Sequence, residues 1–426
     1  MIKIIKDRLE SREEIFSAVN EKVDVSLPVK EIIEKVKREG DSALLYYTEK
    51  FDKVALSSLR VTKEEIDEAF LSVDPTFTEI LREAAENIRD FHKNQKNDGF
   101  TVKKTDGVIV GQKVVAVDRA GLYVPGGTAA YPSTVLMDAI PAKIAGVGRV
   151  VMVTPPQKNG RVNPVILAAA SVAGVDEIYK VGGAQAIAAL AYGTESVPKV
   201  DKIVGPGNAF VAEAKRQVYG EVSIDMIAGP SEIMIVADDK NRAKDIAADL
   251  LSQAEHDRMA SAVLVTDSEQ FAIKVSEELE RQIPLLERAE IARASIDTYG
   301  KIIVTDSIDG AIEVANGIAP EHLELCLDEP FKYLEKVRHA GSVFLGRYCP
   351  EALGDYFAGT NHTLPTSGTA KFSSPLSVDD FVKKTQFIYY DRPSLEKVAK
   401  KVEYFATKEG LTAHAKSAVV RFEDDE

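Results

Sequence analysis

The sequence predicts an α/β protein with parallel sheets. From about residue 108 to residue 350, short runs rich in Val and Ile end in Gly, Pro or Asp, and stretches with helical periodicity follow them. Strands that alternate with helices are typical of parallel sheets. Because 426 residues exceed one ordinary domain, we expect two or three units. The expected strands include residues 150–153, 177–181, 202–204, 233–236, 262–265 and 301–304.

The two ends of the chain differ from this central region. Residues 1 to about 100 are expected to be mostly helical, because charged and apolar residues alternate there with helical periodicity. Residues 347–376 are rich in Pro, Gly and Ser, and predict a long functional loop or linker. Residues 386–390 predict a strand, and helices from Ser394 through His414 complete a small separate unit.

Composition excludes several classes of protein. The net charge of -14 and the isoelectric point near 5.1 argue against nucleic-acid binding, which needs a basic face. Cys326 and Cys349 form no CxxC pattern and fit a reducing compartment. The apolar run at 165–175 is too short to span a membrane, and the first residues lack the pattern of a signal peptide. We therefore expect a cytoplasmic protein that binds no membrane.

Dense Gly-Pro turns follow several expected strands. Turns at the carboxyl ends of strands are where α/β proteins bind ligands, although any single one is equally typical of an ordinary turn. Four of them in matching positions favour a binding crevice. The chain has no Gly-x-Gly-x-x-Gly motif, so its motifs do not indicate a standard dinucleotide fold. The turns lie at residues 121–127, 182–185, 205–208 and 228–232.

Histidines gather in the second half of the chain. Of the six, five fall between His256 and His414, and all of these except His339 have acidic or amide residues nearby. Imidazole both binds transition metals and moves protons near neutral pH. The arrangement predicts a metal site with an acid or base beside it.

Individually these motifs are ambiguous. Gln253 and His256 lie three residues apart on an expected helix at 241–256, so they are neighbours on its surface, but Gln is a poor zinc ligand by general preference. Glu321 and His322 offer two adjacent bases, or an exposed Glu and a capping His. Asp355 could complete a metal site or form an Asx-turn.

Together the motifs resemble the histidinol dehydrogenase family along essentially the whole chain. The order and the spacing of the motifs both match. The segments that carry the resemblance are 121–127, 182–187, 205–208, 229–232, 250–256, 321–323, 354–365 and 411–414.

The resemblance implies oxidation of L-histidinol to L-histidine through L-histidinal, with two NAD⁺. It also implies one zinc ion per active site, with the amino group and imidazole of the substrate completing its coordination. An amide ligand suits a site that opens to six ligands. Zinc would then orient the substrate. The implied zinc ligands are Gln253, His256, Asp355 and His414, and they would also contact the substrate.

The same resemblance assigns roles to further residues. His322 matches the base that takes the alcohol proton, and Glu321 matches the base that activates water to hydrate the aldehyde. His322 would also contact the substrate, and His362 would have a supporting role. The remaining implied contacts are Ser231 and Glu409 with the substrate, and Tyr123, Gln185 and Asn208 with NAD.

The family pattern also implies an obligatory homodimer whose active sites are shared between the subunits. Glu409 and His414 would serve the partner's site. We expect two Rossmann-like domains with parallel sheets, one of them discontinuous, flanked by a helical N-terminal segment and a small dimerisation unit. The expected boundaries are 1–20 for the helical segment, 21–122 with 232–376 for the first domain, 123–231 for the second and 377–426 for the small unit.

Two other functions use the same residues. A zinc-dependent hydrolase would employ the histidines with a metal-bound water. A non-catalytic protein that binds imidazoles or amino acids would keep the ligands and have no use for the bases.

Overall fold

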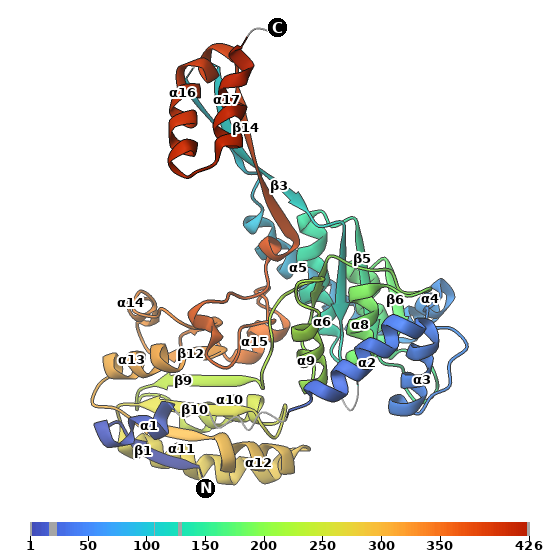
Figure 1. Ribbon diagram of the computed structural model, residues 1–426. Coiled ribbons are helices and arrows are strands. Elements are labelled where there is room, and N and C mark those ends of the chain that lie inside the picture. Colours follow the sequence, from blue (N-terminus) through green and yellow to red (C-terminus); the bar gives the residue numbers. More distant parts are fainter. Residues whose placement is uncertain (1, 17–23, 106, 127–129, 424–426) are drawn as a thin grey trace. The chain divides into compact units, whose positions relative to one another are not determined.

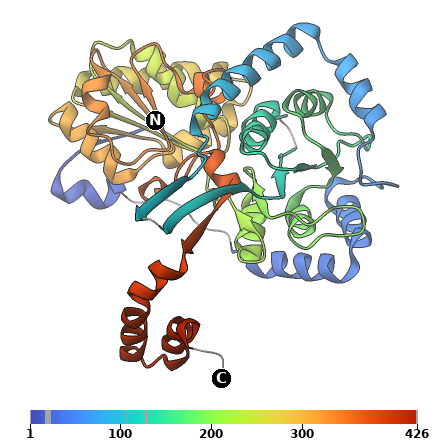
Figure 2. The same ribbon diagram turned by 90° about the horizontal axis from the view of Figure 1, so that it is seen from above.

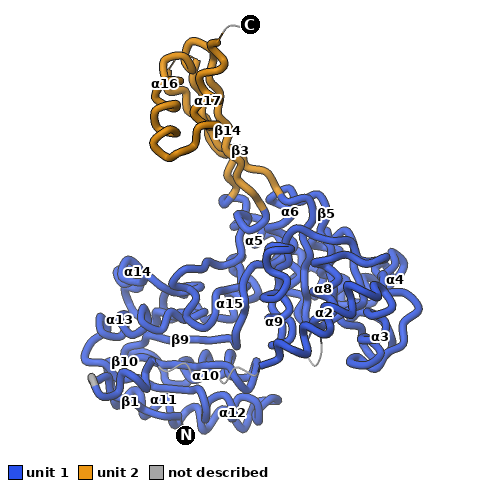
Figure 3. Tube along the Cα trace, in the orientation of Figure 1, with its two compact units in different colours: residues 1–95, 117–381 blue, residues 96–116, 382–426 orange. Residues whose placement is uncertain are grey.

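The computed structural model describes residues 2–16, 24–105, 107–126 and 130–423, which form two compact units (Figure 3). Unit 1 comprises residues 1–95 and 117–381, and unit 2 comprises residues 96–116 and 382–426. The predicted α/β class with two parallel sheets is confirmed, and both of these sheets belong to unit 1.

The first sheet of unit 1, sheet A, has six parallel strands in the order β1-β11-β10-β9-β12-β13. Helices cover both of its faces (Figure 1), which explains why its strands read as continuous apolar runs. The strands are β1 (Lys3–Lys6), β9 (Glu232–Ala237), β10 (Ser261–Thr266), β11 (Lys301–Val304), β12 (His322–Cys326) and β13 (Ser342–Leu345). Helices α10 (Ala243–Ala254), α11 (Glu269–Gln282) and α12 (Ala289–Tyr299) cover one face, and α1 (Arg12–Phe16), α13 (Ile308–Ile318) and α14 (Pro330–Leu334) the other.

The second sheet, sheet B, has five parallel strands in the order β6-β5-β4-β7-β8. From β4 the chain adds β5 and β6 on one side of β4, and then adds β7 and β8 on its other side. The strand order therefore reverses between β4 and β7, and such a topological switch point is where open α/β sheets bind ligands. The strands are β4 (Arg119–Tyr123), β5 (Arg149–Thr154), β6 (Glu177–Lys180), β7 (Lys202–Val204) and β8 (Ser223–Ile224). The helices between them are α6 (Pro132–Ala145), α7 (Pro164–Ala173), α8 (Gly183–Tyr192) and α9 (Ala209–Val218).

The N-terminal helices associate with one of the two sheets. The helices α2 (Ser26–Glu39), α3 (Asp41–Asp52), α4 (Lys63–Ser72) and α5 (Pro75–His92) pack on the helices of sheet B, not on those of sheet A. Val29, Ile33 and Val36 of α2, for example, share a buried cluster with α8. The expected assignment of 21–122 to the same domain as 232–376 stays a prediction, because both ranges, apart from residues 96–116, belong to unit 1. Of the expected helical segment 1–20, the structure describes residues 2–16, and these include strand β1, which pairs with β11 in sheet A.

Unit 2 is built from two distant segments. Its sheet has the order β14-β3-β2 and is antiparallel, with strands β2 (Phe100–Thr105), β3 (Val108–Ala116) and β14 (Val382–Tyr390). The helices α16 (Arg392–Lys408) and α17 (Thr412–Val419) follow and pack on each other (Figure 2). The expected small unit at 377–426 lacked β2 and β3, which the structure adds. Of the helices described, none has the length and apolarity that crossing a bilayer requires.

A short loop joins the two halves of unit 1. The Asn361 amide donates to the carbonyl oxygen of Met137 over 2.7 Å, and the Thr363 hydroxyl donates to Asp138 Oδ1 over 2.9 Å. Both acceptors belong to α6, and His362 lies between the two donors. Asp138 is fully buried, and its other oxygen has no hydrogen-bond partner among the described residues. Burial and the negative charge of Asp225 raise the pKa of Asp138 to about 8.

We predict that Asp138 makes stability fall as pH rises. Because its folded pKa of about 8 exceeds the ordinary value of 3.8, the folded state binds an extra proton between these pH values, and the free energy of unfolding decreases across this window. Asp138→Asn keeps the acceptor for Thr363 and does not titrate. Its unfolding midpoint, measured by calorimetry, should therefore rise relative to wild type between pH 5 and pH 8. The exposed Asp67→Asn is the control, and a difference from wild type that is constant across this range contradicts the prediction.

Candidate functional site

The candidate site lies at the amino ends of β9 and β12 in sheet A. His322 is the first residue of β12, Glu321 precedes it, and the strand pairs with β9, which begins at Glu232. Gln253 is near the end of α10, on the face toward which His322 points. The sequence had suggested binding residues at the carboxyl ends of strands. In sheet A the two expected bases lie at the amino ends instead, and only the residues expected to contact NAD, in sheet B, lie at carboxyl ends.

His322 is held with one ring nitrogen free. Its Nδ1 lies 2.9 Å from the carbonyl oxygen of Glu232 and must donate to it. Its Nε2 is buried without a hydrogen-bond partner among the described residues, 3.7 Å from Glu351 Oε1 and 3.8 Å from Asp355 Oδ1. Fixing the donor at Nδ1 leaves Nε2 to accept a proton, which is the role of a general base.

Glu321 lies beside His322 and is also buried. Its Oε2 accepts from the backbone N–H of Glu232 over 2.8 Å and lies 3.7 Å from His322 Nδ1. Burial raises the pKa of Glu321 to about 8, although the charge of His322 opposes this. A carboxyl that titrates near the working pH is suited to general acid or base catalysis.

The charges around His322 shift its pKa upward. Burial lowers the pKa of the imidazole, but Glu321, Asp355 and Glu351 outweigh this and raise it to about 10. His322, Glu351 and Asp355 have ligand atoms within 4.8 Å of one another, a grouping able to hold a metal ion. A cation here would oppose the effect of the carboxylates and lower the pKa of His322, because positive charge disfavours imidazolium.

Three expected zinc ligands have suitable chemistry. Gln253 is 1% exposed, its Nε2 lies 3.0 Å from His256 Nδ1, and its Oε1 is buried with no hydrogen-bond partner among the described residues. Burial lowers the pKa of His256, so the ring is neutral, as a ligand must be. For Asp355, the effect of burial is outweighed by the nearby His322 and His362 rings, which lower its pKa to about 2. This set fits a zinc ion.

Glu351 is a site residue that our sequence analysis missed. It is 2% exposed, and its Oε2 accepts from the hydroxyl of Ser252 over 3.1 Å. Glu351 and Asp355 are the first and fifth residues of α15 (Glu351–Tyr356), so their side chains share one face of this helix. The spacing of four residues between Glu351 and Asp355 was the available signal. We missed it because we predicted a loop, and not a helix, within residues 347–376.

Near this cluster, His362 also faces Asp355. Its Nδ1 lies 3.6 Å from Asp355 Oδ1, and its Nε2 lies 3.4 Å from the hydroxyl of Thr134 in α6. This ring contacts groups from both halves of unit 1. Ser231 directly precedes β9, at the same end of sheet A.

The residues expected to contact NAD lie in the sheet B half. The Tyr123 hydroxyl accepts from the backbone N–H of Gly183 over 3.1 Å. Gln185 is 1% exposed, and both its amide atoms lack partners among the described residues. Asn208 caps α9 by accepting from the N–H groups of Phe210 and Val211, so it also has a structural role.

The other two expected residues belong to unit 2. Glu409 is the C-terminal cap of α16, and His414 lies in the first turn of α17. Both side chains are exposed.

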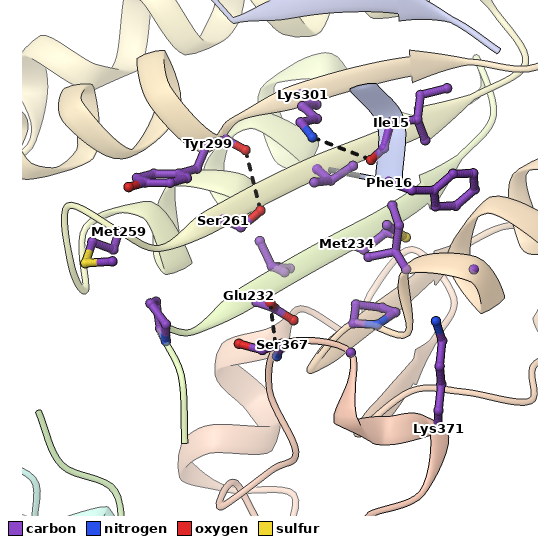
Figure 4. Close-up of a pocket in the computed structure, with 17 residues that line it drawn as sticks. Ile15, Phe16, Glu232, Met234, Met259, Ser261, Tyr299, Lys301, Ser367 and Lys371 are labelled. Carbon is purple, nitrogen blue, oxygen red and sulfur yellow. Dashed lines mark hydrogen bonds between the residues drawn. The ribbon is translucent and has the colours of Figure 1, made fainter. Parts of the chain in front are cut away.

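A separate cavity of about 230 Å³ lies next to the site (Figure 4). The Glu232, Ser261, Lys301 and Lys371 side chains are among those that line it. The Glu232 carboxylate accepts from the N–H of Ser367 over 3.2 Å. Neither the two expected bases nor the expected metal ligands line this cavity. Glu232 therefore faces the cavity with its side chain and the bases with its backbone.

Comparisons with known proteins show which family these features belong to. The family model described as histidinol dehydrogenase matches residues 17–422. The chain belongs to the histidinol dehydrogenase family. It is 55% identical to histidinol dehydrogenase of Clostridium acetobutylicum over 99% of both chains, and 56% identical to that of Bacillus cereus over 93% of this chain and 92% of the relative.

The crystal structure of histidinol dehydrogenase from Elizabethkingia anophelis is similar over 99% of this chain and 98% of its own, with a TM-score of 0.94 and 39% identity. The match confirms the predicted fold class along nearly the whole chain. Membership of the histidinol dehydrogenase family makes the chain an oxidoreductase.

Proposed function

We propose that this protein oxidises L-histidinol to L-histidine through L-histidinal, using two NAD⁺. The observation that carries the proposal is the pair Glu321 and His322, two buried bases oriented by one residue, Glu232. Two successive oxidations need two proton acceptors, one for an alcohol and one for the water that hydrates the aldehyde. NAD⁺ supplies the hydride acceptor for each oxidation.

In the first oxidation, His322 takes the proton of the alcohol at Nε2. Its Nδ1 donates to the Glu232 carbonyl, and this hydrogen bond fixes the tautomer that leaves Nε2 free. Glu351 and Asp355 then stabilise the imidazolium that forms, since their carboxylates lie 3.7 and 3.8 Å from Nε2.

In the second oxidation, Glu321 takes a proton from the water that adds to the aldehyde. Its raised pKa makes the carboxylate a stronger base than an exposed Glu. One oxygen accepts from the Glu232 N–H, which holds the carboxyl in place.

Gln253, His256 and Asp355 would hold the zinc ion together with His414 of the partner subunit. When bound, zinc orients the substrate through the amino group and the imidazole of histidinol. Support comes from the buried, unpartnered Oε1 of Gln253 and from the ionised Asp355. Ser231 of the same chain and Glu409 of the partner subunit would add substrate contacts. A homodimer is therefore part of the proposal.

Tyr123, Gln185 and Asn208 would contact NAD. Tyr123 ends β4, Gln185 lies in the first turn of α8 after β6, and Asn208 caps α9 after β7. The two unpartnered amide atoms of Gln185 support this assignment, because buried amides in native proteins are normally hydrogen-bonded.

Membership of an oxidoreductase family argues against the two other functions considered from the sequence, a zinc-dependent hydrolase and a non-catalytic binding protein. Both are tested by NADH absorbance with purified protein, L-histidinol and NAD⁺. The proposal requires two NADH per histidinol consumed. A hydrolase forms no NADH, and a binding protein gives binding without turnover.

We predict that His256→Asn loses zinc and histidinol binding together, because the proposed ligand serves both. Metal content by atomic emission and histidinol affinity by calorimetry should fall, and activity should be lost. The control is His339→Asn, a half-buried histidine outside the proposed site. Full metal content with normal turnover in His256→Asn excludes the proposed zinc site.

We predict that the two bases act in different steps. His322→Asn should slow the oxidation of histidinol by about 10²–10⁴-fold, the usual contribution of a positioned base. Glu321→Gln should slow the oxidation of supplied histidinal more, because glutamine keeps the hydrogen bond and cannot accept the proton. Single-turnover NADH formation from each substrate distinguishes the steps. If both variants lose both steps equally, the two residues act as one unit.

We predict that unit 2 completes the site of the partner. His414→Ala and His256→Ala should each be inactive, and mixing them should restore activity, because a hybrid dimer contains one site with both histidines intact. At most about a quarter of wild-type activity is expected from random exchange. Heterodimers that form, as shown by mass spectrometry, and stay inactive would assign His414 to the site of its own chain.

A further inference from the structure

A partly buried carboxylate near the sheet B turns has no role in the function proposed so far. Asp52 is the last residue of α3, and its Oδ2 is buried without a hydrogen-bond partner among the described residues. Burial raises the pKa of Asp52 to about 6. An unpartnered buried carboxylate is unfavourable, so such a group in a native protein calls for an explanation.

Contacts at the other end of α3 locate Asp52. Asp41, the first residue of α3, accepts from the Thr194 hydroxyl over 2.6 Å and from the Ser196 N–H over 3.2 Å, just beyond the end of α8. The helices α3 and α8 contact each other and have 12 and 10 residues, so their lengths are about 18 and 15 Å. Since Tyr47 and Leu44 also pack in the cluster of α8, the helices run side by side in opposite directions. Asp52 therefore lies toward the N-terminus of α8.

Other polar groups converge at this helix end. The Tyr123 hydroxyl accepts from Gly183, the first residue of α8, and the charge of Asp52 adds to burial in raising the pKa of Tyr123 to about 12. The Gln185 side chain folds over the same turn, since a Cβ on Gly183 would lie 2.8 Å from its Oε1. Gln185 is buried and has both amide atoms unpartnered among the described residues. The helix end thus has a free amide and a free carboxylate oxygen beside it.

We propose that Asp52 accepts hydrogen bonds from the ribose hydroxyls of the adenosine half of NAD, and so selects NAD over NADP. This rests on the proposed function, because NAD binding at Tyr123 and Gln185 is part of it. A carboxylate accepts from both hydroxyls of a ribose and repels a phosphate on the 2′-oxygen. The nearest basic residue in sequence, Lys53, donates to the carbonyl oxygen of Lys50, so its ammonium is already hydrogen-bonded.

The test is the Asp52→Asn variant of the full-length protein. The KM for NAD⁺ should rise about tenfold, since one charge-assisted hydrogen bond contributes on this scale, with little change in kcat. The ratio of kcat/KM for NAD⁺ to that for NADP⁺ should fall at least tenfold. Glu49→Gln, on the exposed side of the same helix, is the matched control and should leave both values unchanged.

Two kinetic outcomes overturn the proposal. An unchanged ratio with an unchanged KM means that Asp52 does not contact the nucleotide. An equal rise of KM for NAD⁺ and NADP⁺ means that Asp52 acts elsewhere than at the adenosine ribose.

Calorimetry with AMP and with 2′,5′-ADP keeps the inference separate from the proposed function. Wild type should bind AMP more tightly, and Asp52→Asn should narrow the difference; equal affinities of wild type for the two ligands overturn the proposal. If wild type forms no NADH from histidinol, the proposed function fails, and this binding comparison still decides the role of Asp52.

Discussion

The backbone of Glu232 is the point on which the arrangement of the candidate site depends. Its N–H donates to Glu321 and its C=O accepts from His322 Nδ1, so one residue orients both adjacent bases. The parallel pairing of β9 with β12 creates this geometry by placing His322 opposite Ile233. A backbone group does not depend on a side-chain rotamer, and the strand ladder holds it in place. The two bases are therefore positioned as rigidly as the sheet itself.

The same arrangement concentrates negative charge away from water. Glu321 and Glu351 are buried and Asp355 is partly buried around one imidazole. Carboxylates confined in this way are unfavourable unless a proton or a cation neutralises them. This explains why the pKa values of Glu321 and Glu351 are raised, first by burial, and why a divalent cation suits the site. In the proposed site, zinc affinity and the basicity of His322 would have one electrostatic origin, so we expect a change of metal ligand to alter both.

The sequence predicted local features better than their grouping. The parallel strands, the Gln253–His256 pair and the adjacent bases follow from periodicity and spacing within a few residues. Glu351 was missed because the Pro-rich composition of its segment concealed a helix of six residues. The packing of α2 on α8 was not predictable either, since an amphipathic helix specifies a buried face and not the partner that buries it. Asp138 became visible only when the fold brought residues 138 and 363 together.

The two halves of unit 1 carry different groups of the proposed site. The proposed oxidation needs the substrate bound by one half to lie close to the NAD bound by the other. The bases and three of the expected zinc ligands, Gln253, His256 and Asp355, belong to the sheet A half, and the residues expected to bind NAD belong to the sheet B half. The loop at 361–363 joins them: Asn361 and Thr363 bond to α6, while His362 between them faces Asp355. Anchoring on both sides of His362 leaves little freedom for the halves to separate at this point. Hydride transfer is steeply sensitive to distance, so we expect this anchored loop to help hold the two halves at the spacing that the proposed reaction needs.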